Sequence, residues 1–167
     1  KVAQRLGLPL VITARGSDVN LIAQYPGPRE AMLRSAKQAA RVIAVSAALK
    51  QSLIDMGVAP EKIEVLRNGV DTQCFAPREV TALRQRLAAD TGPLIVSVGN
   101  LVPEKGHDLV LRAAARVPHA TLVLVGQGPE RKALAARADA LGMAGRTRFL
   151  DNMSQRELSE IYSAADV

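Results

Sequence analysis

The residues most suited to binding a ligand lie in one short stretch, Val96–Val110, where a predicted strand ends and a helix begins. The pattern predicts a buried strand at Leu94–Val98 and a turn at Gly99. The helix is expected to begin near Lys105 and Gly106. A helix N-terminus presents unpaired backbone N–H groups and a positive dipole end, which suits a phosphate. Lys105 adds a flexible cation at the same place. The stretch therefore predicts a site for a diphosphate.

A second candidate follows another apolar run. Gly126 and Gly128 allow the backbone to approach a ligand closely, and Pro129 is expected to start the next helix. An ordinary strand-to-helix turn would use the same residues, so both interpretations stay open here. The chain contains no Gly-x-Gly-x-x-Gly and no Gly-x-x-x-x-Gly-Lys-Ser/Thr, which disfavours a Rossmann dinucleotide site and a P-loop NTPase.

A third candidate is Arg15-Gly-Ser-Asp18, which follows the first apolar run. Gly16 allows close approach, and Arg15 can bind an anion. Asp18 can cap the next helix, and capping accounts for this residue at least as well as chemistry does. The turn dipeptide Asn68-Gly69 is interpreted as an ordinary turn rather than a ligand contact.

Neither the two histidines nor the cysteine is expected to bind a metal or to act in catalysis. His107 and His119 lack a Cys/His/Asp cluster with metal-ligand spacing, so no metal site is expected. His107 is interpreted as a solvated residue in the first turn of a helix. Cys74 is the only cysteine, which excludes an intramolecular disulfide and fits a reducing compartment. Nothing nearby in the sequence would lower the pKa of its thiol, so it is interpreted as a small junction residue.

The amino-acid composition limits the classes of binding partner to be expected. The 167 residues carry 22 Lys+Arg against 16 Asp+Glu, a net charge of +6 that favours anionic partners. The basic residues are spread along the chain, and aromatics make up only 2% with no Trp, so nucleic acid is not expected as a partner. No apolar run reaches the length of about 18 residues that a membrane-spanning helix needs.

The elements that position these residues alternate between short apolar strands and helices. Little polar alternation within the strands predicts cover on both faces of a parallel sheet. The helices show apolar stripes, glycines at their ends, and a capping box at Ser154 and Glu157. The fold class is therefore α/β, with Rossmann-like parallel sheets and flanking helices. The predicted strands are Leu10–Thr13, Val42–Val45, Ile63–Leu66, Leu94–Val98, Leu122–Val125 and Thr147–Leu150, and the stripes are Val80/Leu83/Leu87, Leu49/Leu53/Met56, Leu134/Ala138/Leu141 and Leu158/Ile161/Ala165, with Gly57 and Gly142 at helix ends.

A turn-rich segment interrupts this pattern between Arg67 and Pro77. Too few strands precede it for a complete domain, and the strands restart after Thr91-Gly-Pro93. We therefore expect parts of two domains, residues 1–70 and 79–167, joined by a linker at 71–78. The chain begins inside an apparent helix at residues 1–6 and ends at 164–167, where a strand is expected to start. It is interpreted as a piece of a longer protein.

Four passages, in this order, resemble the group 1 glycosyltransferases, which are retaining enzymes with two facing Rossmann-like domains (the GT-B fold). The passages are Arg15–Asp18, Val45–Asp71 with Phe75–Pro77, Val98–Gly106, and Val125–Val167. The resemblance implies that residues 1–70 end an N-terminal, acceptor-side domain. It implies that residues 79–167 begin a C-terminal domain that binds the nucleotide sugar.

The resemblance also assigns roles by position. Lys105 would neutralise the donor phosphates, and Arg15 and Asp18 would make the catalytic contacts. Asn100 stands where the family often has Arg, and Arg15 stands where many members have His. No metal and no cofactor are expected, because the nucleotide sugar is a substrate. The donor-binding residues implied by position are Gly16, Gly99, Asn100, Lys105, Gly126, Gly128, Asn152 and Met153.

The function that follows is transfer of a sugar from a nucleotide-diphospho-sugar to a glycan, lipid or small-molecule acceptor, with retention of anomeric configuration. The complete protein is expected in the cytoplasm, with peripheral membrane association as an alternative. The 167-residue piece itself is expected to be inactive and prone to self-association. Two alternatives stay open: a noncatalytic nucleotide- or partner-binding α/β module, and epimerisation of a nucleotide sugar on the same fold.

Overall fold

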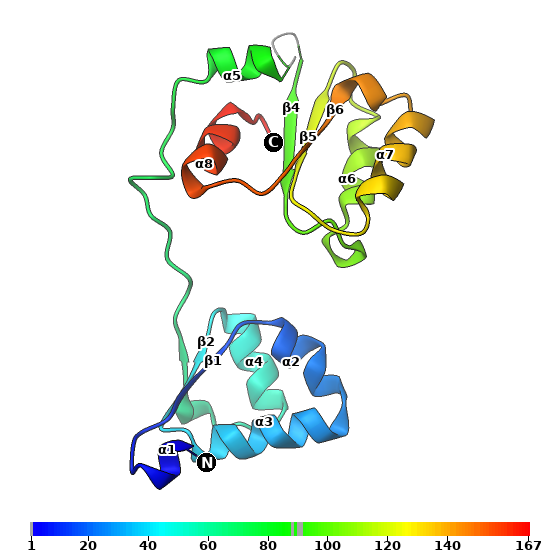
Figure 1. Ribbon diagram of the computed structural model, residues 1–167. Coiled ribbons are helices and arrows are strands. Elements are labelled where there is room, and N and C mark those ends of the chain that lie inside the picture. The colour runs from blue at the N-terminus through cyan, green and yellow to red at the C-terminus, as the bar shows by residue number, and fades with distance from the viewer. Residues whose placement is uncertain (1, 88, 90–91) are drawn as a thin grey trace. The chain divides into compact units, whose positions relative to one another are not determined.

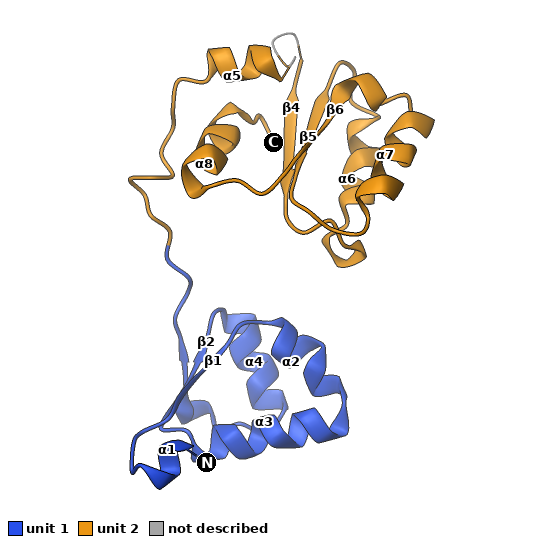
Figure 2. Ribbon diagram, in the orientation of Figure 1, with its two compact units in different colours: residues 1–69 blue, residues 70–167 orange. Residues whose placement is uncertain are grey.

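The chain forms two compact units, residues 1–69 and 70–167 (Figure 2). The computed structural model describes residues 2–87, 89 and 92–167. Each unit has its own three-stranded parallel sheet, with the strand orders β1-β2-β3 and β4-β5-β6. The prediction of two separate parallel sheets with flanking helices is confirmed. Lys1 and Thr91, which we placed in a helix and before a strand, lie outside the described residues.

Unit 1 begins its sheet one residue later than the apolar pattern suggests, and its other two strands also lie within one residue of prediction. Val42, at the centre of the sheet, pairs with Ile12 on one side and Ile63 on the other. The elements are α1 (Val2–Arg5), β1 (Val11–Ala14), α2 (Ser17–Asn20), the 3₁₀ turn η1 (Ile22–Gln24), α3 (Pro26–Gln38), β2 (Arg41–Ala44), α4 (Ala47–Asp55), η2 (Pro60–Lys62) and β3 (Ile63–Val65).

The helices α2, α3 and α4 lie on one side of this sheet (Figure 1). Val42, Ala44 and Ile63 are buried against Leu49 and Leu53 of α4. On the opposite side of the sheet Val11 is exposed and lies in register with Arg41. Arg41 forms an ion pair there with Glu64 at 3.3 Å. Our expectation of strands covered on both faces is therefore wrong for the described part of unit 1.

Unit 2 has helices on both faces of its sheet. Figure 1 shows α6 and α7 on one face and α5 and α8 on the other. All five residues of β5 are buried: Leu122 and Leu124 pack with α6 and α7, whereas Val123 and Val125 pack with α8. The elements are α5 (Thr81–Arg86), β4 (Leu94–Val98), η3 (Pro103–Lys105), α6 (His107–Ala114), β5 (Thr121–Val125), α7 (Arg131–Ala140), η4 (Ala144–Arg146), β6 (Thr147–Leu150) and α8 (Gln155–Ala164).

The helix ends follow the local sequence with small differences. The capping box is present, since Ser154 Oγ accepts from Glu157 N–H at 3.3 Å and Glu157 accepts from Ser154 N–H at 2.9 Å. Gly142 ends α7 with φ 67°, as expected of a left-handed residue. That helix starts at Arg131 rather than at Pro129. Leu141 of the predicted stripe is 39% exposed, and Met143 fills the core instead.

The predicted apolar face of α8 also differs from the observed one, by one residue. Ile161 is buried as expected, but Ala164 rather than Ala165 completes its apolar face. Ala165 is the residue that ends the helix, in an extended conformation. The apolar pattern alone did not mark this end.

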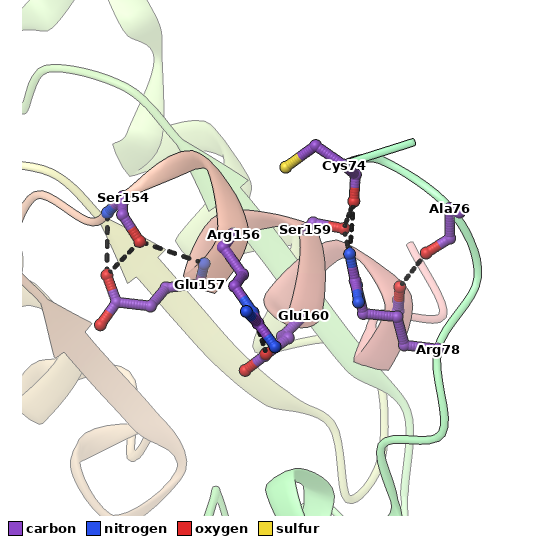
Figure 3. A network of polar contacts seen from close by, with 9 residues as sticks. Cys74, Ala76, Arg78, Ser154, Arg156, Glu157, Ser159 and Glu160 are labelled. Carbon is purple, nitrogen blue, oxygen red and sulfur yellow. Dashed lines mark hydrogen bonds and ion pairs between the residues drawn. The ribbon is translucent and has the colours of Figure 1, made fainter. Parts of the chain in front are cut away.

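The segment before α5 is fixed to α8 by hydrogen bonds (Figure 3). Ser159, which is 2% exposed, donates to the Cys74 carbonyl oxygen at 2.7 Å, and Arg78 donates to the same oxygen at 2.8 Å. Ser163 donates to the Ala76 carbonyl oxygen at 3.3 Å. Residues 74–78 are therefore an ordered part of unit 2. The roles that we predicted for the two domains and their linker stay a proposal.

Candidate functional site

The three strands of unit 2 are parallel, so their carboxyl ends meet at one edge of the sheet. The backbone ladder continues past the strand ends: Gly99 N–H donates to Val125 at 2.9 Å, and Gly126 N–H donates to Leu150 at 2.9 Å. Loops 99–106, 126–130 and 151–154 therefore start side by side. The fold thus brings the predicted donor-binding residues of unit 2 to one edge. They are Gly99, Asn100, Lys105, Gly126, Gly128, Asn152 and Met153.

The first two loops touch backbone to backbone. Leu101 N–H donates to the Gln127 carbonyl at 2.9 Å, and Glu130 N–H donates back to the Leu101 carbonyl at 3.0 Å. A Cβ atom at Gly126 would collide with the carbonyl oxygen of Gly99, and one at Gly128 would collide with the backbone of Leu101. Close packing of the two loops therefore explains both glycines without a ligand, although it does not decide whether a ligand binds beside them.

Unpaired amides remain where these loops leave the sheet. Within the described part of the chain, the backbone N–H groups of Asn100, Gln127 and Gly128 donate to no protein acceptor. They belong to neighbouring loops at one edge, and Asn100 and Gln127 are exposed. Unpaired backbone N–H groups are donors that an anion can use. The edge can therefore receive phosphate oxygens.

Lys105 lies beside this edge. It ends the 3₁₀ turn η3, and Gly106, with φ 65°, leads into α6. The Cδ and Cγ atoms of Lys105 would be 3.7 and 3.8 Å from a Cβ atom at Gly99. Its side chain is exposed and its ammonium group has no hydrogen-bond or ion-pair partner among the described residues. The helix therefore begins two residues after Lys105, and the aliphatic part of the Lys105 side chain passes beside Gly99.

His107 differs from its prediction. We interpreted it as solvated, but it is 3% exposed. Its Nδ1 lies 3.0 Å from Ser97 Oγ, and its Nε2 lies 3.2 Å from the Asn100 carbonyl oxygen. A helical stripe was the missed signal, because His107, Leu111 and Ala114 share one buried face of α6.

The loop after β6 carries a charged pair that the sequence did not suggest. Arg131, at the start of α7, pairs with Asp151 at 2.9 Å, and its guanidinium lies 5.6 Å from the centre of the Phe149 ring. Asn152 is exposed, and Met153 is half-buried against the core. An exposed pair of this kind adds little stability, but it fixes Asp151 at the edge.

Arg15, Gly16 and Asp18 belong to unit 1. They follow β1, where Asp18 Oδ1 accepts from Gly16 N–H at 2.8 Å and from Val19 N–H at 3.0 Å. Gly16, not Asp18, holds the N-cap position of α2. The Asp18 carboxylate closes this loop, so a structural role accounts for it. Arg15 is exposed, and its guanidinium has no partner among the described residues. Their catalytic roles stay a prediction.

Residues 2–87, 89 and 92–167 hold no group of His, Cys, Asp and Glu side chains placed to bind a metal ion. No helix in the same residues combines the length and apolar character needed to cross a membrane.

Comparison with known proteins gives a glycosyltransferase family model for each part of the chain. The model of glycosyl transferases group 1 matches residues 79–167, and that of glycosyltransferase family 4 matches residues 1–73. A D-inositol 3-phosphate glycosyltransferase from Mycobacterium sp. (strain JLS) is 39% identical over 115 residues, which are 65% of this chain and 26% of that protein. The protein of that name from Mycobacterium tuberculosis (strain ATCC 25177 / H37Ra) is 36% identical over 118 residues, 66% of this chain and 24% of its own.

Solved structures resemble the whole chain. Anabaena Alr3699/HepE, solved in complex with UDP, is 25% identical with a TM-score of 0.86, over 98% of this chain and 47% of that one. The structure of WaaG, a glycosyltransferase involved in lipopolysaccharide biosynthesis, is 21% identical with a TM-score of 0.73, over 95% and 50%. The matched part of this chain spans about a quarter of the curated relatives and about half of the solved chains.

Proposed function

The chain belongs to the group 1 glycosyltransferases, and from this premise we propose that the complete protein transfers a sugar from a nucleotide-diphospho-sugar to an acceptor with retention of anomeric configuration. One observation carries the proposal. The edge of the second sheet combines the unpaired amides of Asn100, Gln127 and Gly128 with the free ammonium group of Lys105. This edge lies within the part that matches the group 1 model, and Alr3699/HepE was solved with UDP and with UDP-glucose.

Each part of the edge has a role in the proposal. The amides of Asn100 and Gln127 donate to the diphosphate, and Lys105 neutralises its charge. Gly99 leaves room for the phosphates over the backbone. The loop of Asn152 and Met153 receives the nucleotide base. In this proposal, Lys105 and the backbone amides neutralise the leaving diphosphate, without a metal or cofactor.

In this proposal the loop of Arg15, Gly16 and Asp18 in unit 1 supplies the catalytic contact, and Gly16 lets the backbone approach the donor. Arg15 supplies a permanent positive charge that stabilises the negative charge developing on the leaving group. Asp18 keeps the loop of Arg15 and Gly16 in shape through its bonds to Gly16 N–H and Val19 N–H.

For the acceptor, we propose an anionic small molecule as the first to be tested. Residues 1–69, the proposed acceptor side, carry ten Lys and Arg against five Asp and Glu, whereas residues 70–167 carry twelve against eleven. The excess positive charge is therefore concentrated in unit 1, which favours a negatively charged acceptor. Two mycobacterial relatives are named for D-inositol 3-phosphate, which has this property.

The test is made on the complete protein. Binding of UDP-, GDP- and ADP-sugars is measured by calorimetry, and the binding donor is then incubated with D-inositol 3-phosphate and with other acceptors. Proton NMR of the product reports its anomeric configuration. We expect one donor to bind and to give a product with the configuration of the donor. Binding without transfer to any acceptor would favour the noncatalytic module, and an inverted product would contradict retention.

Four further expectations stay predictions. They are the cytoplasmic location and the peripheral membrane association of the complete protein, and the inactivity and the self-association of residues 1–167 alone. Sugar transfer by purified residues 1–167 would contradict the expected inactivity.

A further inference from the structure

His107 is a buried polar side chain that the proposed transfer chemistry does not use. It is the first residue of α6, and its ring lies between β4 and the loop that follows β4. Ser97 lies on the face of β4 that also carries Ile95, which packs under α6 and α7. The imidazole therefore joins a strand residue to a loop carbonyl from inside the protein.

The contact with the Asn100 carbonyl determines one proton position on the ring. A carbonyl oxygen only accepts hydrogen bonds, so the 3.2 Å contact with Asn100 requires a proton on Nε2. The Ser97 hydroxyl can donate, so Nδ1 can accept from it at 3.0 Å. A neutral ring with its proton on Nε2 satisfies both contacts.

The same contacts fix the loop. The Asn100 carbonyl accepts from His107 Nε2 at 3.2 Å and from Val102 N–H at 2.9 Å, and the N–H of the same peptide unit, that of Leu101, donates to Gln127 at 2.9 Å. On the other side, Gly99 N–H donates to Val125 at 2.9 Å. The Asn100 N–H, which has no protein partner in the described chain, therefore stands between two fixed peptide units.

We propose that His107 is a positioning residue for the donor diphosphate: as the neutral Nε2–H tautomer, it holds the peptide unit between Asn100 and Leu101. The free N–H of Asn100, in the preceding peptide unit, is thereby presented to a phosphate oxygen. This inference rests on the proposed function, since it names how that site is kept in shape. His107 does not touch the ligand. It acts through the backbone of residues 99–101.

The first measurement is spectroscopic. The chain has two histidines, and His119 is exposed, so it serves as an internal control. Ring nitrogens of the uniformly ¹⁵N-labelled 167-residue chain are assigned by long-range proton–nitrogen correlation. We expect His107 to have a protonated Nε2 and an unprotonated Nδ1, and His119 to show averaging between tautomers. Averaging at His107, or protons on both of its nitrogens, would overturn the inference.

The second measurement uses three variants of the same chain. His107→Leu keeps the apolar volume and removes the donor, His107→Gln keeps an N–H donor close to the place of Nε2, and Ser97→Ala removes the partner of Nδ1. Titrations use UDP, GDP and ADP, each with its nucleoside. We expect His107→Leu to shift the Asn100 and Leu101 amide resonances and to weaken diphosphate binding about tenfold, the size of one net hydrogen bond.

The controls separate positioning from general damage. We expect nucleoside binding to be unchanged in His107→Leu, and His107→Gln to recover most of the diphosphate affinity. Ser97→Ala, the mildest change, is expected to lose the single-tautomer signature and to weaken diphosphate binding several-fold. Equal diphosphate affinity of wild type and His107→Leu, or an equal loss for nucleoside and diphosphate, would overturn the inference alone. If none of the three diphosphates binds the wild-type 167-residue chain, the titrations are repeated on the complete protein, and absence of binding there would overturn the proposed function and this inference with it.

Discussion

Single residues at the carboxyl edge of the second sheet act in opposite ways. Gly126 and Gly128 act by lacking a side chain, because the loops meet backbone to backbone there. Lys105 acts through its exposed charge, and His107 acts from a buried position under the same loop. Substitutions at these positions should therefore have different consequences, for stability in one case and for ligand binding in the other.

Gly126→Ala is expected to destabilise unit 2. The residue has φ 143°, and its new Cβ atom would collide with the Gly99 carbonyl oxygen, so the backbone must shift. We expect a loss of about 1–3 kcal/mol in the free energy of unfolding, measured by urea denaturation. Gly145→Ala is the matched control, because its Cβ atom would meet nothing within 4 Å. A loss at Gly145 as large as that at Gly126 would contradict this explanation.

Lys105→Ala is expected to weaken nucleoside diphosphate binding by about tenfold to a hundredfold in the complete protein, as for a hydrogen bond between charged groups. Nucleoside binding should hardly change, because the ammonium group acts on phosphate. Lys132→Ala, at an exposed position of α7, is the control. Asn100→Arg should leave diphosphate affinity unchanged or raise it, since it adds a planar cation. Calorimetry decides, and an unchanged affinity in Lys105→Ala would mean that Lys105 is only a solvated lysine.

The sequence placed the glycines and Lys105 but misplaced His107. Strand-end glycines and a lysine before a helix are local signals, readable in a window of about ten residues. The burial of His107 depends on Ser97 and Asn100, which approach it only after α6 packs on the sheet. The Arg131–Asp151 pair was missed for the same reason, since its partners are 20 residues apart and come from different elements.

At the scale of elements, strands were easier to predict than helix ends. Each strand lies within one residue of its predicted run, because at least half of the residues in every strand are apolar. Pro129 suggested a helix start two residues early, since proline also suits the turn before a helix. The uncovered face of unit 1 was missed because its strands have only three or four residues, too few to show a clear alternation.

Two serine caps offer matched tests of helix ends in the two units. Ser46 Oγ accepts from Leu49 N–H at 3.1 Å at the start of α4, and Ser154 Oγ accepts from Glu157 N–H at the start of α8. Ser46→Ala and Ser154→Ala should each lower the free energy of unfolding by about 1 kcal/mol. Amide hydrogen exchange should show the loss in unit 1 for the first variant and in unit 2 for the second. Loss in the wrong unit would contradict the assignment.

At the scale of the whole molecule, the chain consists of two separate cores, one in each unit. A turn-rich segment between two strand-rich regions predicted that division. The sequence did not indicate that residues 74–78 dock on α8, because Ser159 and Ser163 look like ordinary helix-surface serines until their partners are known. Local patterns thus predict the elements better than the contacts between them.

The two cores should unfold separately. Leu53→Ala empties part of the unit 1 core, and Leu124→Ala empties part of the unit 2 core, each at a cost of about 2–5 kcal/mol. Differential scanning calorimetry should resolve two transitions, and each substitution should lower the midpoint of one of them. A single transition that both substitutions shift equally would mean that the units unfold as one.

Unit 2 should lose stability in acid through Asp166. The Leu94 backbone N–H, followed by the Arg84 guanidinium, holds the pKa of Asp166 below its usual value. A carboxyl with a lowered pKa in the folded state stabilises the fold above its unfolded pKa, and this contribution is lost as the pH falls through the folded value. Asp166→Asn should therefore destabilise unit 2 at neutral pH, and the difference should shrink below about pH 4.

Urea midpoints of wild type and Asp166→Asn across this range provide the measurement. Asp139→Asn, at an exposed site of α7, is the control that should change little at any pH. A difference between wild type and Asp166→Asn that stays constant into acid would show that the charge of Asp166 does not contribute.

The last two residues of the chain also cover a strand. Asp166 N–H donates to the Leu94 carbonyl at 2.9 Å, and Val96 N–H donates to the Val167 carbonyl at 2.8 Å, so β4 has backbone partners on both sides. Deleting residues 166 and 167 from the 167-residue chain would free the Val96 amide and the Leu94 carbonyl. An uncovered strand edge is a template for pairing with another chain. Without these two residues β4 would have an unpaired side, and the shortened chain should precipitate before the 167-residue chain.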